Sequence, residues 1–170
     1  MLELSKHTLG GNNEELVFGS REDVRAIALA LTQQCQRTLD IVGRHLDPEL
    51  YEVPEFLDAV RKLITRSSHS RIRMLVLQPE ALYRRGHKLI TLAGAFSSFC
   101  HVRIPGPDHQ DINEAMLVAD ETGYLHRKLS DRYEGTANFN NRAYIGGLMR
   151  RFEEVWMTAE VDSNFQRLRI

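Results

Sequence analysis

Segments with the apolar spacing of helices alternate along this chain with short strand-like segments, and this alternation constrains its fold more than any other feature. Helical spacing of apolar residues occurs at positions 24–35, 54–65, 81–98 and 145–156. Short apolar or alternating runs occur at positions 39–43, 71–77, 101–104, 112–119 and 124–127. Elements in this order build one sheet that is covered by helices. The sequence therefore predicts an α/β fold with a mixed, mostly parallel sheet, an antiparallel hairpin near its end, and helices on both faces.

The length of the chain fits one domain. It has 170 residues, and domains typically contain roughly 100 to 200 residues. Residues 1–19 include the run Gly-Gly-Asn-Asn at 10–13 and only scattered apolar side chains, a composition that buries little surface. We expect this segment to be a flexible arm or linker. The folded domain is then expected at residues 20–160, and a C-terminal tail at 161–170.

Capping residues mark two of the expected helix starts. Ser20 is placed to cap the first helix, and Asn140 or Asn141 is placed to cap the last one. Gly146 and Gly147 lie inside that last helix, where each costs about 1 kcal/mol relative to alanine. We therefore expect this turn of the helix to pack closely against another part of the protein.

Charge and hydropathy exclude several classes of protein. The 22 Lys and Arg residues against 23 Asp and Glu residues give a net charge of -1, so a site for a polyanion has to be local. No apolar run approaches the roughly 18 to 20 residues that span a bilayer, and the N-terminus lacks the apolar core of a signal peptide. Cys35 and Cys100 are far apart and form no C-x-x-C pair, which predicts reduced core thiols. We expect a cytoplasmic protein with no membrane contact.

The common motifs of nucleotide, metal and serine-nucleophile sites are missing from the sequence. It contains no G-x-G-x-x-G, P-loop or G-x-S-x-G pattern. None of its 7 histidines forms an H-x-H or H-x-x-x-H pair. We therefore expect no metal ion and no cofactor.

A cation and a titratable donor follow the first strand-like segment. Arg44 and His45 come directly after residues 39–43, and in an open α/β sheet the ligand crevice lies at the carboxyl ends of the strands. A guanidinium and an imidazole there suit a phosphate or a carboxylate. The simpler alternative is that both side chains are solvated or paired with Asp47 or Glu49.

Two further segments carry residues that take part in phosphate chemistry. His126, Lys128 and Asp131 combine the residue types that transfer phosphoryl groups through a histidine nucleophile, and positions 126 and 128 face the same way on a strand. A solvated hairpin has the same composition, so both interpretations stay open.

Residues 135–141, GTANFNN, lead into a helix whose free N–H groups favour an anion, although a plain capping loop fits equally.

Five stretches of the chain follow one another in an order found in a known fold. They are LDIVGRHLDPELYEVPEFLDAVRKLI, RIRMLVL, MLVADETGYL, GTANFNN and RRFEEVW. From Ser20 to Ala159 the pattern resembles one half of the phospholipase D superfamily fold. In that resemblance the stretches are similar, in order, to the first strand and its helix, the second strand, the signature strand and hairpin, the G-S-x-N segment, and the closing helix. The resemblance implies a phospholipase D-like half.

The catalytic signature of that superfamily is H-x-K-x4-D, in which His attacks the phosphodiester, Lys holds the phosphate oxygens and Asp supports the site. When Asp120 is aligned with the Asp of the signature, Asn113 aligns with the nucleophilic His and Ala115 aligns with the Lys. Asparagine does not form a phosphohistidine and alanine does not bind phosphate. This register therefore implies a degenerate domain without the catalysis of the family.

An alternative register starts at His126 and Lys128. Its acid would fall on Tyr133, and Asp131 lies two residues early, a displacement of roughly 6.6 Å along a strand. We therefore prefer the degenerate register.

The preferred register implies a vestigial pocket and a dimer. By the resemblance, the phosphate-binding pocket would consist of Arg44, His45, Asn113, Asp120 and Asn138. Active members join two such halves about a twofold axis, so a single half implies a homodimer.

Three functions are compatible with these residues. The first is a non-catalytic binding or scaffold module for a phosphate-containing ligand or a nucleic-acid backbone, and we favour it over an enzyme. The second is a divergent, metal-independent phosphodiesterase or nuclease that uses His126 and Lys128. The third is a regulatory domain that binds a protein partner, for which residues 1–19 are the candidate contact.

Overall fold

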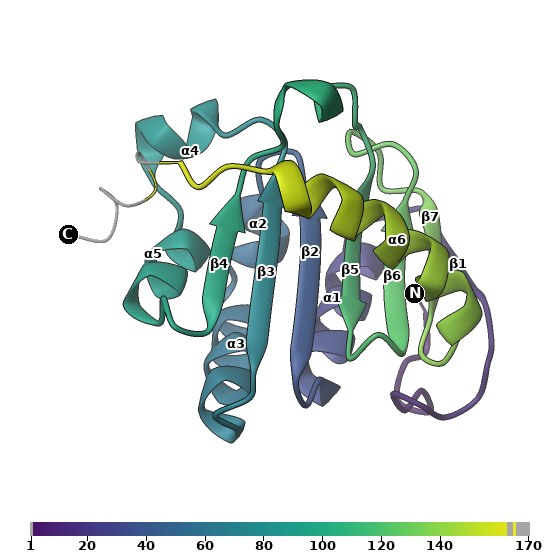
Figure 1. The fold of residues 1–170 in the computed structure, drawn as a ribbon. Helices are drawn as coiled ribbons and strands as arrows, with labels where there is room; N and C mark the ends of the chain where they lie inside the picture. The colour runs from purple at the N-terminus through teal and green to yellow at the C-terminus, as the bar shows by residue number, and fades with distance from the viewer. Residues whose placement is uncertain (1, 163–164, 166–170) are drawn as a thin grey trace.

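The computed structural model describes residues 2–162 and 165, and in this part of the chain seven strands form one sheet (Figure 1). The strands are β1 (Leu16–Phe18), β2 (Thr38–Gly43), β3 (Arg71–Val76), β4 (Cys100–Arg103), β5 (Ala115–Ala119), β6 (Gly123–Arg127) and β7 (Gly135–Asn138). Their order across the sheet is β1-β7-β6-β5-β2-β3-β4. Strands β2, β3 and β4 are parallel to one another, whereas β5, β6, β7 and β1 continue the sheet from β2 in antiparallel pairs.

Helices cover both faces of the sheet (Figure 1). On one face lie α1 (Arg21–Gln34), α3 (Pro54–Arg66) and α5 (Lys88–Ala95), and on the other lies α6 (Arg142–Thr158). Shorter elements in the connections are α2 (Pro48–Tyr51), α4 (Glu80–Arg85) and a 3-10 turn at Pro107–His109. The expected α/β fold with a mixed sheet, parallel core strands and helices on both faces is therefore confirmed.

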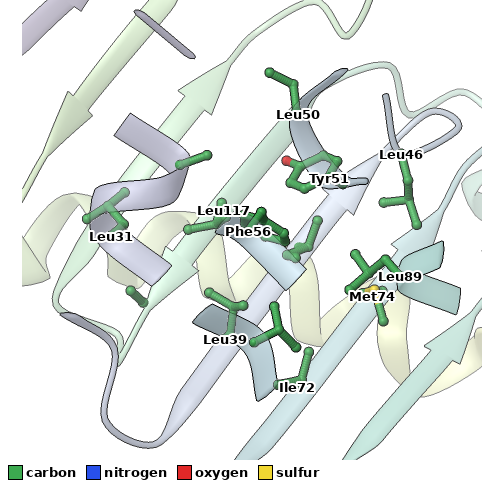
Figure 2. Close-up of a cluster of buried hydrophobic side chains, with 14 of the residues drawn as sticks. Leu31, Leu39, Leu46, Leu50, Tyr51, Phe56, Ile72, Met74, Leu89 and Leu117 are labelled. Atoms are coloured by element: carbon green, nitrogen blue, oxygen red, sulfur yellow. The ribbon is translucent and has the colours of Figure 1, made fainter. Parts of the chain in front are cut away.

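The larger apolar core lies between the sheet and helices α1 and α3 (Figure 2). Leu31 of α1 and Phe56 of α3 are buried here, over strand residues such as Leu39 and Leu117. Full burial of such a side chain contributes about 1.5–3 kcal/mol. This core fixes the strands whose ends carry the candidate site.

Helix α6 is held on the opposite face by apolar side chains and by one buried arginine. Arg73 of β3 donates from Nε to Asp40 at 2.7 Å, and from its terminal nitrogens to Glu153 of α6 at 2.6 and 3.1 Å. Its guanidinium also lies 4.7 Å from the ring centroid of Phe152. Burial raises the pKa of the Asp40 carboxyl, and the positive charge of Arg73 opposes that rise. The ion-pair chain therefore fixes α6 relative to β2 and β3.

Residues 2–19 pack on the domain and do not form a detached arm. Strand β1 pairs with β7, and Leu16 and Phe18 are buried. Upstream, the Leu9 N–H donates to the side chain of Gln34 at 2.7 Å. The sheet therefore begins before the expected boundary at residue 20. The composition argument failed because three residues with alternating burial are enough to add an edge strand.

Two elements differ from the sequence prediction. The helix expected within 81–98 is divided into α4 and α5 at Gly86, whose φ of 72° interrupts a helix. Residues 135–138, expected as a loop, form β7 between β1 and β6. Its small and polar side chains gave no strand signal, because pairing on both sides stabilises it rather than intrinsic propensity.

The expected caps are confirmed, but the expected packing of the glycine pair is wrong. Ser20 Oγ accepts the Asp23 N–H at 3.2 Å, and Asn141 Oδ1 accepts the Tyr144 N–H at 3.1 Å. A Cβ at Gly146 or Gly147 would meet no described atom within 4 Å outside the helix's own backbone. No close neighbour among the described residues therefore requires glycine at these two positions.

The expected tail is described at Val161, Asp162 and Phe165, and its other residues lie outside the described part. Phe165 is buried, and its ring centroid lies 5.4 Å from that of Tyr83 in α4. Across residues 2–162 and 165, no helix has the length and apolarity needed to cross a membrane.

Candidate functional site

A polar pocket of about 160 Å³ lies at the sheet edge where β2 and β6, the two neighbours of β5, both end. Its lining is Gly43, Arg44, His45, Leu46, Asp47, Tyr51, Arg127, Ser130, Asp131 and Tyr133. The loop after β2 turns sharply because Leu46 has a φ of 54° and because the Asp47 carboxylate accepts the Glu49 N–H at 3.0 Å, which starts α2. The pocket lies where a ligand crevice is expected in an open α/β sheet.

Arg44, which lines this pocket, has an unused hydrogen-bond donor. Its Nε is buried and has no hydrogen-bond partner among the described residues. A buried donor without a partner costs about 1–3 kcal/mol. An acceptor oxygen of a bound anion would remove this cost.

Asp47 and Glu49 were the alternative ion-pair partners for Arg44 and His45, and both carboxylates interact with other residues. Asp47 accepts a hydrogen bond from the Tyr133 hydroxyl at 2.5 Å. Glu49 forms an ion pair with Arg21. In the described part of the chain, neither carboxylate forms an ion pair with Arg44 or His45.

Arg127 adds a second guanidinium that sequence reasoning missed. Its side chain is buried, and its Nη1 donates to the Arg132 carbonyl at 2.9 Å and to the Ser130 carbonyl at 3.4 Å. On β5 the residue directly opposite is Ala115, which stands at the lysine position of the signature. Directly opposed residues of antiparallel strands point to the same face, so Arg127 supplies a positive charge where Ala115 has none. The alternation of side chains along a strand was the signal that could have identified it.

His45 is the titratable group in this pocket. Burial lowers the pKa of its imidazole, Arg44, Arg85 and Arg127 lower it further, and the nearby Asp47 raises it. Three guanidiniums and one carboxylate therefore act on His45, and a bound anion would relieve the repulsion from the guanidiniums.

Asn113 joins the rim of this pocket through Ser130. Its Oδ1 accepts the Ser130 hydroxyl at 2.6 Å, and its carbonyl accepts the Ser130 N–H at 2.8 Å. Asp131 lines the same pocket. The structure thus places Asp131 beside Arg44 rather than in a group with His126.

Asp120 lies at the other edge of the sheet. It follows the last residue of β5, which runs antiparallel to β2, and is seven residues from Asn113, about 23 Å along an extended strand. Its carboxylate accepts hydrogen bonds at 2.8, 2.8 and 3.0 Å from the N–H groups of Gln36, Arg37 and Thr38. Asp120 therefore fixes the start of β2 and does not contribute to the pocket of Arg44.

Asn138 is also separated from Arg44. It pairs with Tyr124 at the end of β7, on the edge where Asp120 lies. Its side chain is buried, donates to Asn13 at 2.7 Å and accepts the Asn140 N–H at 2.9 Å. Strand direction, which the sequence did not specify for residues 135–138, accounts for this separation.

His126 of the alternative register lies on the other face of β6 from Arg127. His126 and Lys128 line one pocket of about 200 Å³. Both ring nitrogens of His126 are engaged, Nε2 with Glu114 at 2.7 Å and Nδ1 with the Tyr144 hydroxyl at 2.6 Å. A nucleophilic attack by His126 would break one of these hydrogen bonds.

The described residues include no group of three or more His, Cys, Asp and Glu side chains that could hold a metal ion. Cys35 and Cys100 are free and buried. Burial raises the pKa of both thiols, that of Cys100 to about 12. Both thiols are therefore protonated at neutral pH.

Comparison with known families identifies the sequence over most of its length. Residues 20–168 match a family described as "Domain of unknown function (DUF7931)". Among curated proteins, none matches the chain.

Comparison with solved structures establishes the fold. The structure of TrmBL2, an archaeal chromatin protein described as showing a novel mode of DNA binding, superposes with a TM-score of 0.67 at 14% identity, over 94% of this chain and 57% of that chain. Nuc from Salmonella typhimurium, a phospholipase D family member, gives a TM-score of 0.56 at 11% identity, over 88% of this chain and 97% of that one. NucT from Helicobacter pylori gives 0.56 at 8% identity, over 89% and 100% of the two chains. The fold is therefore phospholipase D-like.

Proposed function

The chain belongs to the DUF7931 family, and from the geometry of its polar pocket we propose that it is a non-catalytic phospholipase D-like domain that binds a phosphate group. The group is one of the kind found in a nucleic-acid backbone, and Arg44, His45 and Arg127 bind it. The observation that carries this proposal is that Arg44 lines a pocket with a second guanidinium, and that its buried Nε has no partner among the described residues.

The chemistry of the pocket favours a phosphate over a neutral ligand. A guanidinium presents donors in a fork that matches two oxygens of a phosphate. His45 adds a donor that becomes charged when an anion is near. The fold is similar to that of a chromatin protein that binds DNA, which supports a nucleic-acid backbone as the source of the phosphate.

The absence of catalysis is part of the proposal. Asn113, at the nucleophile position of the signature, uses its side-chain oxygen to hold Ser130. Ala115 replaces the lysine, and no lysine is among the described residues that line this pocket. Binding by Arg44 and Arg127 is therefore retained without the signature nucleophile.

A phosphate titration with matched variants tests the proposal. We expect phosphate and a short single-stranded oligonucleotide, added in excess EDTA, to raise the melting temperature. Arg44→Ala should weaken binding roughly 10- to 100-fold, because a charge-assisted hydrogen bond contributes about 1.5–3 kcal/mol. Arg150→Ala, an exposed arginine of α6 on the opposite face, is the control and should bind as wild type does. An equal loss in both variants, or no shift in wild type, would refute the proposed site.

We propose that the functional form is a homodimer. The support is the resemblance to a superfamily whose active members pair two such halves. Sedimentation equilibrium should give twice the chain mass of 19.6 kDa. A single species at the chain mass would contradict the dimer.

A second candidate function is a metal-independent phosphodiesterase or nuclease that uses His126 and Lys128. The observation in its favour is that both side chains line one pocket. Hydrolysis of bis(p-nitrophenyl) phosphate in EDTA that is lost in His126→Ala would support it. The third function, a protein-interaction domain, gains no support, because residues 2–19 pack on the domain.

A further inference from the structure

A buried histidine contacts the loop that carries Arg44 and His45. His87 caps the start of α5, and its side chain is fully buried. Its Nε2 lies 2.7 Å from the carbonyl oxygen of Leu46, and its Nδ1 accepts the Leu89 N–H at 3.1 Å. Leu46 is one of the residues that line the pocket of Arg44. His87 therefore joins the start of α5 to the lining of the proposed phosphate site.

The two partners of His87 determine its protonation state. A backbone N–H only donates and a carbonyl oxygen only accepts. Nδ1 faces the Leu89 N–H and must therefore be unprotonated, whereas Nε2 faces the Leu46 carbonyl and must carry the proton. Burial lowers the pKa of the imidazole, and this effect exceeds the opposing effects of the Leu46 carbonyl and Glu52. The ring is therefore neutral at neutral pH and donates to Leu46.

Glu52 does not compete for the proton on Nε2 of His87. Its Oε1 lies 4.0 Å from this nitrogen, beyond hydrogen-bond distance, and 3.8 Å from Nη1 of Arg85. Its Oε2 accepts the Lys88 N–H at 2.9 Å. The Leu46 carbonyl therefore remains the acceptor for His87.

The backbone of Leu46 has an uncommon conformation. Its φ of 54° lies in the left-handed region, which leucine rarely adopts. A residue keeps such a conformation only where its surroundings hold it. The side chain of Leu46 is buried, and its carbonyl is held by His87. These two contacts together stabilise the turn that follows His45.

The hydrogen bond from His87 lies between two other attachments of the same loop. On one side of it, the Arg44 carbonyl accepts the Gln78 N–H at 2.6 Å. On the other side, the Asp47 side chain caps α2. The bond from His87 orients the peptide group between these attachments. Loss of this bond would therefore allow the loop to rotate at Leu46 and would displace the donors of the pocket.

We propose that His87 is a positioning residue for the phosphate site: it donates from Nε2 to the Leu46 carbonyl and so holds the loop in which Arg44 and His45 bind the anion. This role rests on the proposed function, since it concerns the same pocket. His87 is not among the described residues that line the pocket. Its effect on affinity therefore passes through Leu46.

Two substitutions of His87 separate its two hydrogen bonds. Asparagine is a preferred N-cap residue, so His87→Asn keeps an acceptor for the start of α5, but its amide is too short to reach Leu46. In His87→Gln, the longer amide supplies a donor near the position of Nε2. Calorimetry with inorganic phosphate should show roughly 3- to 10-fold weaker binding for His87→Asn, as expected for one lost hydrogen bond. His87→Gln should bind as wild type does, and wild-type affinity in His87→Asn would overturn the proposal.

Thr91→Val is the matched control. The Thr91 hydroxyl donates to the His87 carbonyl at 3.2 Å, so this substitution alters the same turn of α5 and leaves both ring nitrogens of His87 in place. Its phosphate affinity should equal that of wild type. A loss equal to that of His87→Asn would assign the effect to the helix instead of the bond to Leu46, and would overturn the proposal.

Nuclear magnetic resonance of the wild-type protein tests the assignment without any substitution. Long-range ¹H–¹⁵N spectra distinguish a protonated from an unprotonated ring nitrogen. We expect the proton of His87 on Nε2, with and without phosphate. A proton on Nδ1 would overturn the proposal even if the variants fail to fold.

The spectra also separate failure of this role from failure of the binding pocket. In the absence of phosphate, His87→Asn should shift the signals of the Arg44 Nε–H and of the His45 ring, because the loop that carries them moves. Unchanged signals would overturn the positioning role. Wild type that shows these shifts on substitution but binds no phosphate would refute the proposed function alone.

Discussion

At the scale of single residues, charge rather than shape distinguishes the two polar sites. Arg44 and Arg127 concentrate positive charge at one edge of the sheet, and the carboxylates of Asp47 and Glu49 are engaged with other groups. His126 instead is hydrogen-bonded to the Glu114 carboxylate, which is ionised at neutral pH. The first arrangement suits binding of an anion, and the second holds His126 in place through both ring nitrogens.

The first pocket predicts a pH-dependent affinity. In the free protein, burial lowers the pKa of His45, and neighbouring guanidiniums lower it further. A bound anion favours the imidazolium and raises that pKa, so binding takes up a proton. Affinity should therefore be higher at low pH and fall as the pH rises through the pKa of His45 in the complex.

Calorimetry of a phosphodiester ligand checks this dependence, because the charge of a phosphodiester does not change over the range. Titrations between about pH 5 and 8 cover the ordinary range of histidine. His45→Gln should bind with a flat profile. An affinity that rises with pH in wild type would contradict the role of His45.

Part of this site was predictable from the sequence and part was not. Arg44 and His45 were found because they follow a strand, and ligand sites gather at strand ends. Arg127 was missed because its function depends on Ala115 being opposite, and strand pairing is not visible in one sequence. Asp120 was misplaced because the direction of β5 relative to β2 determines the edge at which it lies.

At the scale of elements, α6 combines strong attachment with weak helix propensity. The Arg73 ion pairs hold α6 to β3. Gly146 and Gly147 lower the helix propensity of α6, and a Cβ at either position would have no close neighbour in the described part of the chain. The helices at 24–35, 54–65 and 145–156 were predictable because their apolar stripes repeat over several turns. Strands β1 and β7 were not, because pairing with neighbours stabilises such short segments more than their own composition does.

Helix α6 predicts a stabilising substitution. Gly146→Ala should raise the free energy of unfolding by about 0.5–1 kcal/mol, because alanine has the better helix propensity and the added methyl group meets open space. Urea denaturation measures the change. Gly135→Ala is the matched control and should destabilise, because its Cβ would overlap the His126 carbonyl and the Phe18 ring. A destabilised Gly146→Ala variant would show that this turn of α6 contacts something further.

At the scale of the whole molecule, a phospholipase D-like half carries two polar sites on opposite faces of one strand. Residues 126 and 127 are neighbours on β6 and point to opposite faces. The near-neutral net charge of -1 means that attraction to a polyanion comes from local clusters. The phosphate-binding pocket can therefore be tested separately from the residues around His126.

The most direct test of the central claim is a phosphate titration followed through the arginine Nε–H signals in ¹H–¹⁵N spectra. The Arg44 Nε is buried without a partner among the described residues, so its signal should move when an acceptor binds. We predict saturable shifts for Arg44 and Arg127 and none for Arg150. Unchanged Arg44 and Arg127 signals at saturating phosphate would contradict the proposed binding pocket.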